Sequence, residues 1–202
     1  MNILTDRLPD TVEIGGAEFE INTDFRAGIA FELMVEKGEQ RIGRLLSPFF
    51  PDGFPCEVIT EAFVEDALEK ALVFYRLGDD TEQKQEKTGK QSYSFDVDGE
   101  TIYADFWRYY GLDLSTSYLH WWSFRALLTG LPDDSGFKQR VYYRTCELSG
   151  LPKKERERIN KIRNLIAIHP EGKRKLTLEE RNAQMKNYVA QRSKEANKGV
   201  SE

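Results

Sequence analysis

Apolar and polar residues alternate on both sides of Gly15 and Gly16, near the start of the chain. An alternation with period two is the pattern of a half-buried strand, and glycine readily supplies the positive φ angles of a two-residue turn. The pattern therefore predicts a short β-hairpin. The residues expected to pair across it are Val12 and Ile14 in the first strand with Phe19 and Ile21 in the second.

Beyond the hairpin, apolar residues recur every three or four positions, which is the period of an α-helix. Asn22 or Thr23 is expected to cap the first helix, which runs to about Lys37, and Gly38 is expected to end it. These signals are typical of a mainly α fold, a helical domain with one small N-terminal β-hairpin. The same period predicts further helices over about 39–47, 58–77, 96–110, 116–129, 135–148 and 152–166.

The stretch YLHWWSFRALLTGLP, residues 118–132, holds two adjacent tryptophans and one of the two histidines. Ser115 or Thr116 is expected to cap its helix. Projected onto a helix, the stretch is nearly surrounded by apolar side chains, so we interpret it as the central helix of the core rather than a pocket or a stacking platform. The residues assigned to the core are His120, Trp121, Trp122, Phe124, Phe106 and Tyr110.

His120 lies within this apolar arc and is therefore expected to be buried. An unpaired buried polar group costs about 1–3 kcal/mol, so the imidazole needs a hydrogen-bond partner. Asp105, Asp113 and Ser123 are the candidates for that partner. We expect this histidine to stabilise the fold rather than to catalyse a reaction.

Two polar stretches interrupt the helical pattern. Residues 79–91 hold no apolar residue and predict a mobile loop. After His169 large apolar residues become sparse, while Thr177 and Glu180 form a capping box for a further helix to about Lys194. We expect a helical core domain over 1–168 and a polar, protruding C-terminal helical tail over 169–202.

The net charge of −5 conceals an asymmetry between the two halves of the chain. Residues 1–100 carry 10 basic and 22 acidic side chains, a net −12, whereas residues 101–202 carry 19 and 12, a net +7. Such polarity favours head-to-tail contacts between copies or contacts with a charged partner, while separate solvated faces are the plainer explanation. The candidate partner-binding residues are Lys153, Lys154, Arg156, Arg158, Lys173, Arg174 and Lys175, with Met185 and Val189 in the tail.

The chain carries no motif of nucleophilic, nucleotide-binding or zinc chemistry, and its two histidines lack partners at metal-ligand spacing. Asp96 and Asp98 resemble the beginning of a calcium loop, but Arg108 stands where its glutamate ligand would be. Asp133 and Asp134 precede a helix, and carboxylates there favour its N-terminus. We therefore expect no enzymatic activity, no cofactor and no metal.

The sequence also limits the cell compartment in which the protein is expected and the partners that it is expected to bind. No apolar run approaches the roughly 20 residues that cross a bilayer, and the N-terminus lacks the pattern of a secretory signal. Cys56 and Cys146 fit a reducing cytoplasm better than a disulfide framework. Glutamates interrupt the basic run from Lys153 to Lys175, so a solvated face or a docking surface for an acidic protein explains it better than nucleic-acid binding.

Several motifs together resemble the bacteriophage gene-product-fifteen family, found in long-tailed phages and prophages of Gram-positive hosts. Asp96 and Asp98 are followed by IYADF, YYGLDL, LHWWSFRALLTGL and VYYR, and near the N-terminus LPDTVEIGGAEFEINTDFRAGIAFE is similar to the family's opening, in which a hairpin leads into a D-F-R helix. YGLDL followed by LHWW is specific in combination. The resemblance spans roughly residues 7–168.

The resemblance implies a phage tail-assembly protein without catalytic residues. We expect a chaperone that binds the tape-measure protein in the host cytoplasm, self-associates, and is absent from the mature virion. The major tail protein is a further candidate partner. One alternative is a structural tail or connector component retained in the virion. A second is a nucleic-acid-binding phage regulator that uses the basic segment.

Overall fold

The computed structural model describes residues 2–53, 60–78 and 91–168, which belong to one compact unit bounded by Met1 and Ile168. The loop expected over 79–91 lies outside the described residues except for Gln91, and the tail expected over 169–202 lies wholly outside them. Both expectations stay predictions.

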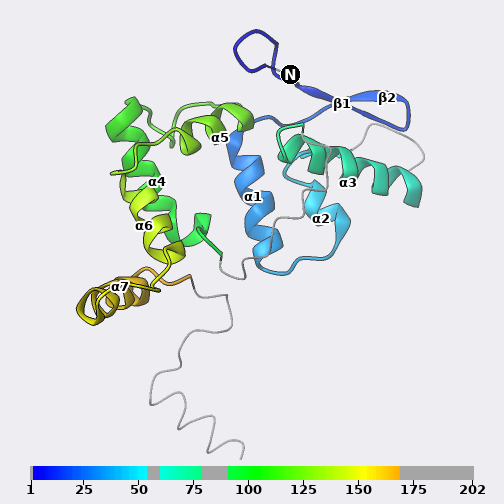
Figure 1. The fold of residues 1–202 in the computed structure, drawn as a ribbon. Helices are drawn as coiled ribbons and strands as arrows, with labels where there is room; N and C mark the ends of the chain where they lie inside the picture. Colours follow the sequence, from blue (N-terminus) through cyan, green and yellow to red (C-terminus); the bar gives the residue numbers. More distant parts are fainter. Residues whose placement is uncertain (1, 54–59, 79–90, 169–202) are drawn as a thin grey trace, which may run out of the picture. The chain divides into compact units, whose positions relative to one another are not determined.

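One hairpin and seven helices make up the regular structure of the described residues (Figure 1). The two strands pair antiparallel, and the helices that follow enclose a single hydrophobic core. The mainly α fold expected from the periodicity is therefore confirmed. The strands are β1 Thr11–Ile14 and β2 Ala17–Glu20, and the helices are α1 Phe25–Glu36, α2 Ile42–Leu46, α3 Glu61–Tyr75, α4 Phe95–Tyr110, α5 Trp121–Thr129, α6 Gly136–Thr145 and α7 Lys153–Leu165.

The hairpin turns through Gly15–Gly16, whose φ angles of 59° and 81° lie in the left-handed region that glycine adopts without strain. Val12 pairs with Phe19, as the alternation predicts. Ile14 pairs with Ala17, because a two-residue turn places its immediate neighbours opposite each other.

Helix α3 holds the hairpin against the core. The carboxylate of Asp66 accepts a hydrogen bond from the N–H of Gly15 at 2.7 Å, and the rings of Phe19 and Phe63 meet edge to face at 5.6 Å. The prediction that Ile21 pairs with Val12 or Ile14 was wrong: this residue follows the end of β2, its N–H donates to the carbonyl of Asp10 at 3.0 Å, and its side chain is buried in the core.

Helix α1 begins with Asp24 as its cap, whose carboxylate accepts from the N–H of Arg26 at 2.9 Å. The prediction of Asn22 or Thr23 as the cap was wrong, because both side chains have other partners. The Asn22 amide oxygen accepts from the N–H of Asp24, and the Thr23 hydroxyl bonds that of Tyr118 at 2.6 Å.

Two side chains from different parts of the chain cap helix α6. The hydroxyl of Ser135 accepts from a backbone N–H in the first turn, and Asp105 of α4 accepts from the first two N–H groups of α6 at 3.2 and 2.7 Å. The capping role expected for Asp133 and Asp134 was therefore wrong. A buried carboxylate from a neighbouring helix takes it and joins α6 to α4.

Aromatic rings stack through the centre of the core. The ring of Phe124 lies 4.8 Å from that of Phe25 and 5.2 Å from that of Phe106, measured between centroids, and both pairs are stacked. Trp121 stacks on Tyr75 at 5.3 Å. Helices α1, α3, α4 and α5 thus meet at one set of aromatic contacts.

Helix α1 approaches Trp121 so closely that only glycine fits at position 28. A Cβ atom built there would lie 2.4 Å from Cε3 of the indole. Alanine normally stabilises a helix interior by about 1 kcal/mol relative to glycine. Here we expect Gly28→Ala to destabilise the domain by about 1–3 kcal/mol in urea denaturation, because the core is overpacked.

Gly99 provides the matched control, since it also lies inside a helix but has nothing within 4 Å of a built Cβ atom. Gly99→Ala is expected to stabilise the domain by about 0.5–1 kcal/mol. Equal effects of the two substitutions would contradict the close packing of α1 on Trp121.

Candidate functional site

Two short segments that lie far apart in the sequence pair with each other beside the core. The N–H of Trp121 donates to the carbonyl of Thr23 at 2.7 Å, and the first N–H of α1 donates to the carbonyl of Leu119 at 2.9 Å. The two bonds make an isolated antiparallel bridge between Asp24 and His120. Helices α1 and α5 therefore both begin at this bridge.

Helix α5 begins at Trp121, and the prediction of a helix from Ser115 or Thr116 was wrong. His120 is the cap, and its Nδ1 accepts from the backbone N–H two residues further on at 3.1 Å. Asp113 draws the preceding segment into a turn, because its carboxylate accepts from both the N–H and the hydroxyl of Ser115, at 2.9 and 2.6 Å.

His120 is partly buried, and both of its ring nitrogens are hydrogen-bonded. Because Nδ1 accepts, Nε2 carries the proton and donates to the carbonyl of Pro9 at 2.9 Å. The partners predicted for it, Asp105, Asp113 and Ser123, were wrong: the first caps α6 and the second holds a turn. The expectation of a hydrogen-bonded histidine holds, with backbone groups as its partners.

Replacing His120 by alanine is expected to lower the free energy of unfolding by about 1–3 kcal/mol, because the cap of α5 and the bond to Pro9 are both lost. His120→Asn keeps a capping oxygen without reaching Pro9, so it should lose roughly half as much. Urea denaturation of the two variants measures the difference. Wild-type stability in the alanine variant would contradict this role.

The two indole N–H groups close the end of α3. Trp121 donates to the carbonyl of Tyr75 at 2.9 Å, and Trp122 donates to the carbonyl of Phe74 at 2.8 Å. Carbonyls in the last turn of a helix lack the usual partner four residues further on. The Phe74 carbonyl also accepts from the N–H of Leu77 at 3.1 Å, so the indole of Trp122 is an additional donor to it. Both tryptophans thus hold the end of α3 while filling the core. Among the residues assigned to the core from the sequence, four are buried and two are partly buried: Trp121, Trp122, Phe124 and Phe106, and then His120 and Tyr110.

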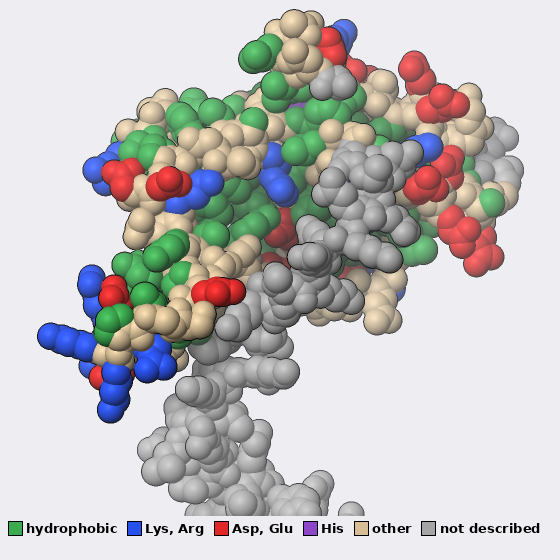
Figure 2. All heavy atoms as spheres, in the orientation of Figure 1, with side chains coloured by type: hydrophobic (Ala, Val, Ile, Leu, Met, Phe, Trp, Pro, Cys, Tyr) green, Lys and Arg blue, Asp and Glu red, His purple; other side chains and the backbone are tan. Residues whose placement is uncertain are grey.

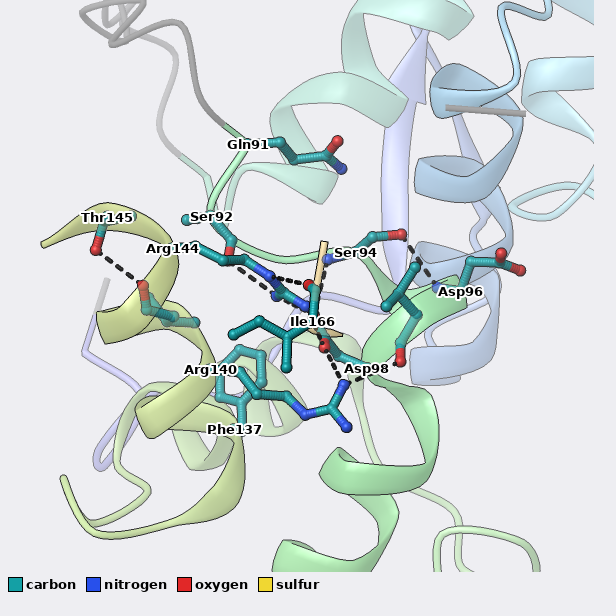
Figure 3. A network of polar contacts seen from close by, with 12 residues as sticks. Gln91, Ser92, Ser94, Asp96, Asp98, Phe137, Arg140, Arg144, Thr145 and Ile166 are labelled. Atoms are coloured by element: carbon teal, nitrogen blue, oxygen red, sulfur yellow. Dashed lines mark hydrogen bonds and ion pairs between the residues drawn. The ribbon is translucent and has the colours of Figure 1, made fainter. Parts of the chain in front are cut away.

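A charged cluster lies inside the domain, between α4 and α6 (Figure 3). Asp98 is fully buried, and its two carboxylate oxygens accept from Arg144 at 2.6 and 2.8 Å. Arg140 donates to it at 3.0 Å and the N–H of Ser94 at 3.1 Å. Four donors thus surround one buried carboxylate, as a stable buried charge requires.

Burial alone would raise the pKa of Asp98, since a charged form is poorly solvated inside a protein. The hydrogen bonds from Arg144, Ser94 and Arg140 outweigh that effect and hold the pKa below its ordinary value. Asp98 is therefore ionised at neutral pH and is a structural charge.

Arginines from α6 and α7 fix the two helices to each other. Arg144 also donates to the carbonyls of Ser92 and Ile166, at 3.2 and 2.9 Å. Arg163 donates to the carbonyl of Tyr143 at 2.6 Å and to that of Cys146. The buried cluster is in this way continuous with the place where α7 ends.

The inner face of α7 differs in one position from the prediction. Ile159 is buried, and Ile162 and Ile166 are partly buried, as their spacing predicts. The prediction that Leu165 points inward was wrong, because its side chain is 86% exposed. An exposed leucine therefore stands at the end of a basic helix.

The structure gathers the basic residues of α7 on its surface, where Figure 2 shows a concentration of blue side chains. Positions 154, 158, 161 and 165 recur at helical spacing and share one face, which Leu165 completes. The exposed members of the predicted binding set are Lys153, Lys154, Arg156 and Arg158, joined by Lys161. The other predicted members, Lys173, Arg174, Lys175, Met185 and Val189, lie outside the described residues.

Acidic side chains gather on a second surface, formed by the hairpin and α3 (Figure 2). Glu13 and Glu18 face each other across the two strands, and glutamates recur every four residues along α3. Like charges in these positions destabilise a hairpin and a helix slightly. The exposed members of this acidic surface are Glu13, Glu18, Glu20, Glu61, Glu65 and Glu69.

One further carboxylate lies between helices. Glu32 of α1 accepts from the Tyr75 hydroxyl at 2.5 Å. Burial raises the pKa of Glu32, and the hydrogen bond from Tyr75 only partly opposes the effect. Burial likewise raises the pKa of Tyr93 to about 12. Tyr75 and Tyr93 pack against the hydrophobic core.

A metal site and a membrane-spanning helix each need a particular arrangement of residues, and the described part of the chain lacks both. No group of three or more His, Cys, Asp or Glu side chains in this part of the chain is arranged to hold a metal ion. Among the same residues, no helix is both long enough and apolar enough to span a membrane.

The described geometry is that of a helical domain with charged outer surfaces, in which the polar clusters of the interior serve packing. A family model described as Bacteriophage Gp15 protein matches residues 4–168. The chain therefore belongs to this bacteriophage family. No curated protein and no solved structure matches it.

The motifs that resemble the family meet in the structure and have structural roles. Asp98 and Arg144, the last residue of VYYR, form the buried ion pair. Arg26, from the D-F-R segment, donates to the carbonyls of Leu114 and Ser117 at 2.6 and 3.3 Å, next to YGLDL. The pairing of Asp98 with Arg144 was missed in the sequence. The available signal was an aspartate at an apolar position of the α4 stripe.

Proposed function

We propose that this phage protein is a non-enzymatic tail-assembly chaperone that binds the tape-measure protein and keeps it soluble while the tail tube assembles. Family membership supports the phage setting. The observation that carries the proposal is the exposed face of α7, in which lysines and arginines surround a leucine that is 86% exposed.

Such a face suits a long helical client. Lysine and arginine stems are flexible and present both an apolar length and a charged end, so they adapt to many acidic and apolar positions. A set of exposed contacts gives moderate binding that tail-tube subunits can displace, whereas a deep pocket would hold one short segment. The chaperone then acts in the host cytoplasm and leaves before the virion matures.

Co-expression with the tape-measure protein tests the proposal. The wild-type chain should keep the client in the soluble fraction, and Lys154→Glu combined with Lys161→Glu should return it to the pellet. Arg7→Glu combined with Arg76→Glu reverses the same number of charges on other exposed residues and should have no effect. A client that remains insoluble with the wild-type chain would disprove the chaperone function.

The alternative functions predict different results. A structural tail component would be found by mass spectrometry in purified particles, where a chaperone is absent. A regulator would bind DNA or RNA at about 0.15 M salt, and its affinity would fall steeply with salt. The nucleic-acid binding measurement is needed because exposed lysines and arginines, such as those of α7, can also contact phosphates.

The two charged surfaces also support head-to-tail self-association, in which α7 of one copy meets the acidic surface of the next. This contact would align copies along a client. Because the Debye length falls from about 8 Å at 0.15 M salt to about 3 Å at 1 M, high salt should dissociate the head-to-tail contact. A mass that salt does not change would exclude this contact.

A further inference from the structure

Helix α4 has one face in the core and one face uncovered. The uncovered face runs along the helix through Glu100, Tyr103, Ala104, Trp107 and Arg108, all of which are exposed. The opposite face supplies the buried positions, which are Phe95, Asp98, Ile102, Asp105 and Phe106.

The centre of the uncovered face is aromatic and already ordered. Tyr103 is 39% exposed and Trp107 55% exposed, and their rings stack at 6.4 Å with an angle of 27° between planes. The Tyr103 hydroxyl donates to Asp113 at 3.2 Å, which restrains that ring. An ordered aromatic pair loses little conformational freedom on binding, and tryptophan is the residue type most enriched at binding hot spots.

The charges at the two ends of this face are arranged symmetrically. Glu100 lies four residues before Ala104, and Arg108 lies four residues after it. When two such helices run antiparallel and cross at Ala104, the glutamate of each copy lies at the same height as the arginine of the other. The guanidinium of Arg108 lies 5.3 Å from the centre of the Tyr109 ring, which holds the charge near the helix.

We propose that the uncovered face of α4 is a two-fold dimer interface, in which α4 of one copy packs antiparallel on α4 of a second copy. Ala104 lies at the crossing, where a small side chain lets the helices approach. Trp107 of each copy packs beside Ala104 of the other, and two Glu100–Arg108 ion pairs close the ends.

A second copy fits this face better than an unrelated partner because the pattern is complementary to itself. A two-fold interface uses the same patch on both subunits, so acidic and basic residues must be placed symmetrically about its centre. Between Glu100 and Arg108 the sequence of α4 meets that condition with one residue of each sign, and the exposed Asp96 lies one turn further from the crossing. The inference does not rest on the proposed function, and it uses a surface different from α7 and from the acidic surface.

Sedimentation velocity over a roughly hundredfold range of protein concentration tests the interface, because a dimer forms by mass action. We expect a monomer–dimer equilibrium for the wild-type chain. Glu100→Arg and Arg108→Glu should each weaken it about 10-fold or more by placing like charges opposite each other. The double variant Glu100→Arg with Arg108→Glu should restore it to within about 3-fold, since the pairs reform with reversed sign.

Two further variants complete the design. Trp107→Ala should weaken the dimer about 30-fold, as expected for a central hot-spot residue. Asp52→Arg makes the same change of charge on an exposed residue outside α4 and should leave the equilibrium unchanged. Circular dichroism confirms that each variant is folded, which is expected because every substituted position is exposed.

The possible results separate the interfaces. Three results would each overturn the proposal. The wild-type chain could be a monomer at all concentrations, the single charge reversals could have no effect, or the double variant could stay monomeric. Self-association that disappears at about 1 M salt would also overturn it and would indicate the head-to-tail contact. Acrylamide quenching of Trp107 fluorescence tests the remaining possibility. If the chain stays monomeric and the quenching decreases only after a tape-measure fragment is added, the face binds the client instead.

Discussion

Replacing Arg144 by methionine is expected to lower the free energy of unfolding by about 3–5 kcal/mol, the cost of leaving a buried charge without its partner. Asp98 is fully buried, and Arg144 supplies a donor to each of its oxygens. Methionine keeps much of the apolar stem and removes every hydrogen bond. Urea denaturation monitored by circular dichroism measures the loss.

Arg140 is the matched control, because it bonds the same carboxylate through a single nitrogen and its side chain is 33% exposed. Arg140→Met should cost about 1 kcal/mol. Combining Arg144→Met with Asp98→Leu removes both charges and should recover most of the loss, since an apolar pair needs no solvation. If the double variant is as unstable as Arg144→Met alone, the cost does not come from an unpaired charge.

The pH dependence of the free energy of unfolding distinguishes the contribution of the Asp98–Arg144 ion pair from that of other titrating groups. The pKa of Asp98 is lowered in the folded state, so its contribution is present above its ordinary value of 3.8 and is lost as the pH falls below that value. The pKa of Glu32 is raised, so its effect has the opposite sign, and stability rises as the pH falls from 7 toward 4.5. Without Arg144 burial raises the pKa of Asp98, so the stability gap between wild type and Arg144→Met should begin to narrow above about pH 4 and continue to narrow below it. A constant gap would contradict this assignment.

Trp121→Ala is expected to cost about 3–5 kcal/mol as well, through a large cavity rather than a lost charge. The indole is fully buried and stacks on Tyr75 and Phe124. Its removal also leaves the carbonyl at the end of α3 without a donor. We expect the variant to be largely unfolded near room temperature, so that its thermal melt no longer shows a cooperative transition.

Trp107→Ala is the control for Trp121→Ala, because it removes the same side chain from a position that is 55% exposed. A surface change of this kind should stay within about 0.5 kcal/mol for the monomer. Similar losses from the two substitutions would contradict the assignment of one tryptophan to the core and the other to the surface.

The sequence was sufficient for the elements whose signals are local. Alternation about Gly15–Gly16 predicts the hairpin, and the spacing of Ile102, Phe106 and Tyr110 predicts α4, which ends at Gly111 in the left-handed conformation. Family membership also follows from motifs that can be read in order along the chain.

The errors arose where a distant residue decides the local structure. The start of α5 was placed too early, because the bonds to Pro9 and Thr23 that favour His120 as the cap have no counterpart nearby in the sequence. Asp105 caps a helix that begins 31 residues later, which no local pattern indicates. Leu165 was placed in the core by periodicity alone, but its side chain is 86% exposed.

The candidate site was predicted only in part for a similar reason. Composition drew attention to the basic run on α7. The structure exposes its basic residues from Lys153 to Lys161, whereas Arg163 is partly buried and bonds the carbonyls of Tyr143 and Cys146. The aromatic face of α4 was overlooked because Trp107 lies in a helix that also carries the buried aromatic residues Phe95 and Phe106. Only the arrangement of neighbouring helices distinguishes a covered aromatic residue from an exposed one.

The bridge between the starts of α1 and α5 affects how the chain folds during synthesis. Thr23 is bonded to Tyr118 across 95 residues of chain and to Trp121 just beyond it. Ribosomes extend a chain at about 5–20 residues per second, so the part of α1 that packs on α5 lacks its partner for several seconds. The growing chain thus passes through an interval in which its own first helix is open to aggregation.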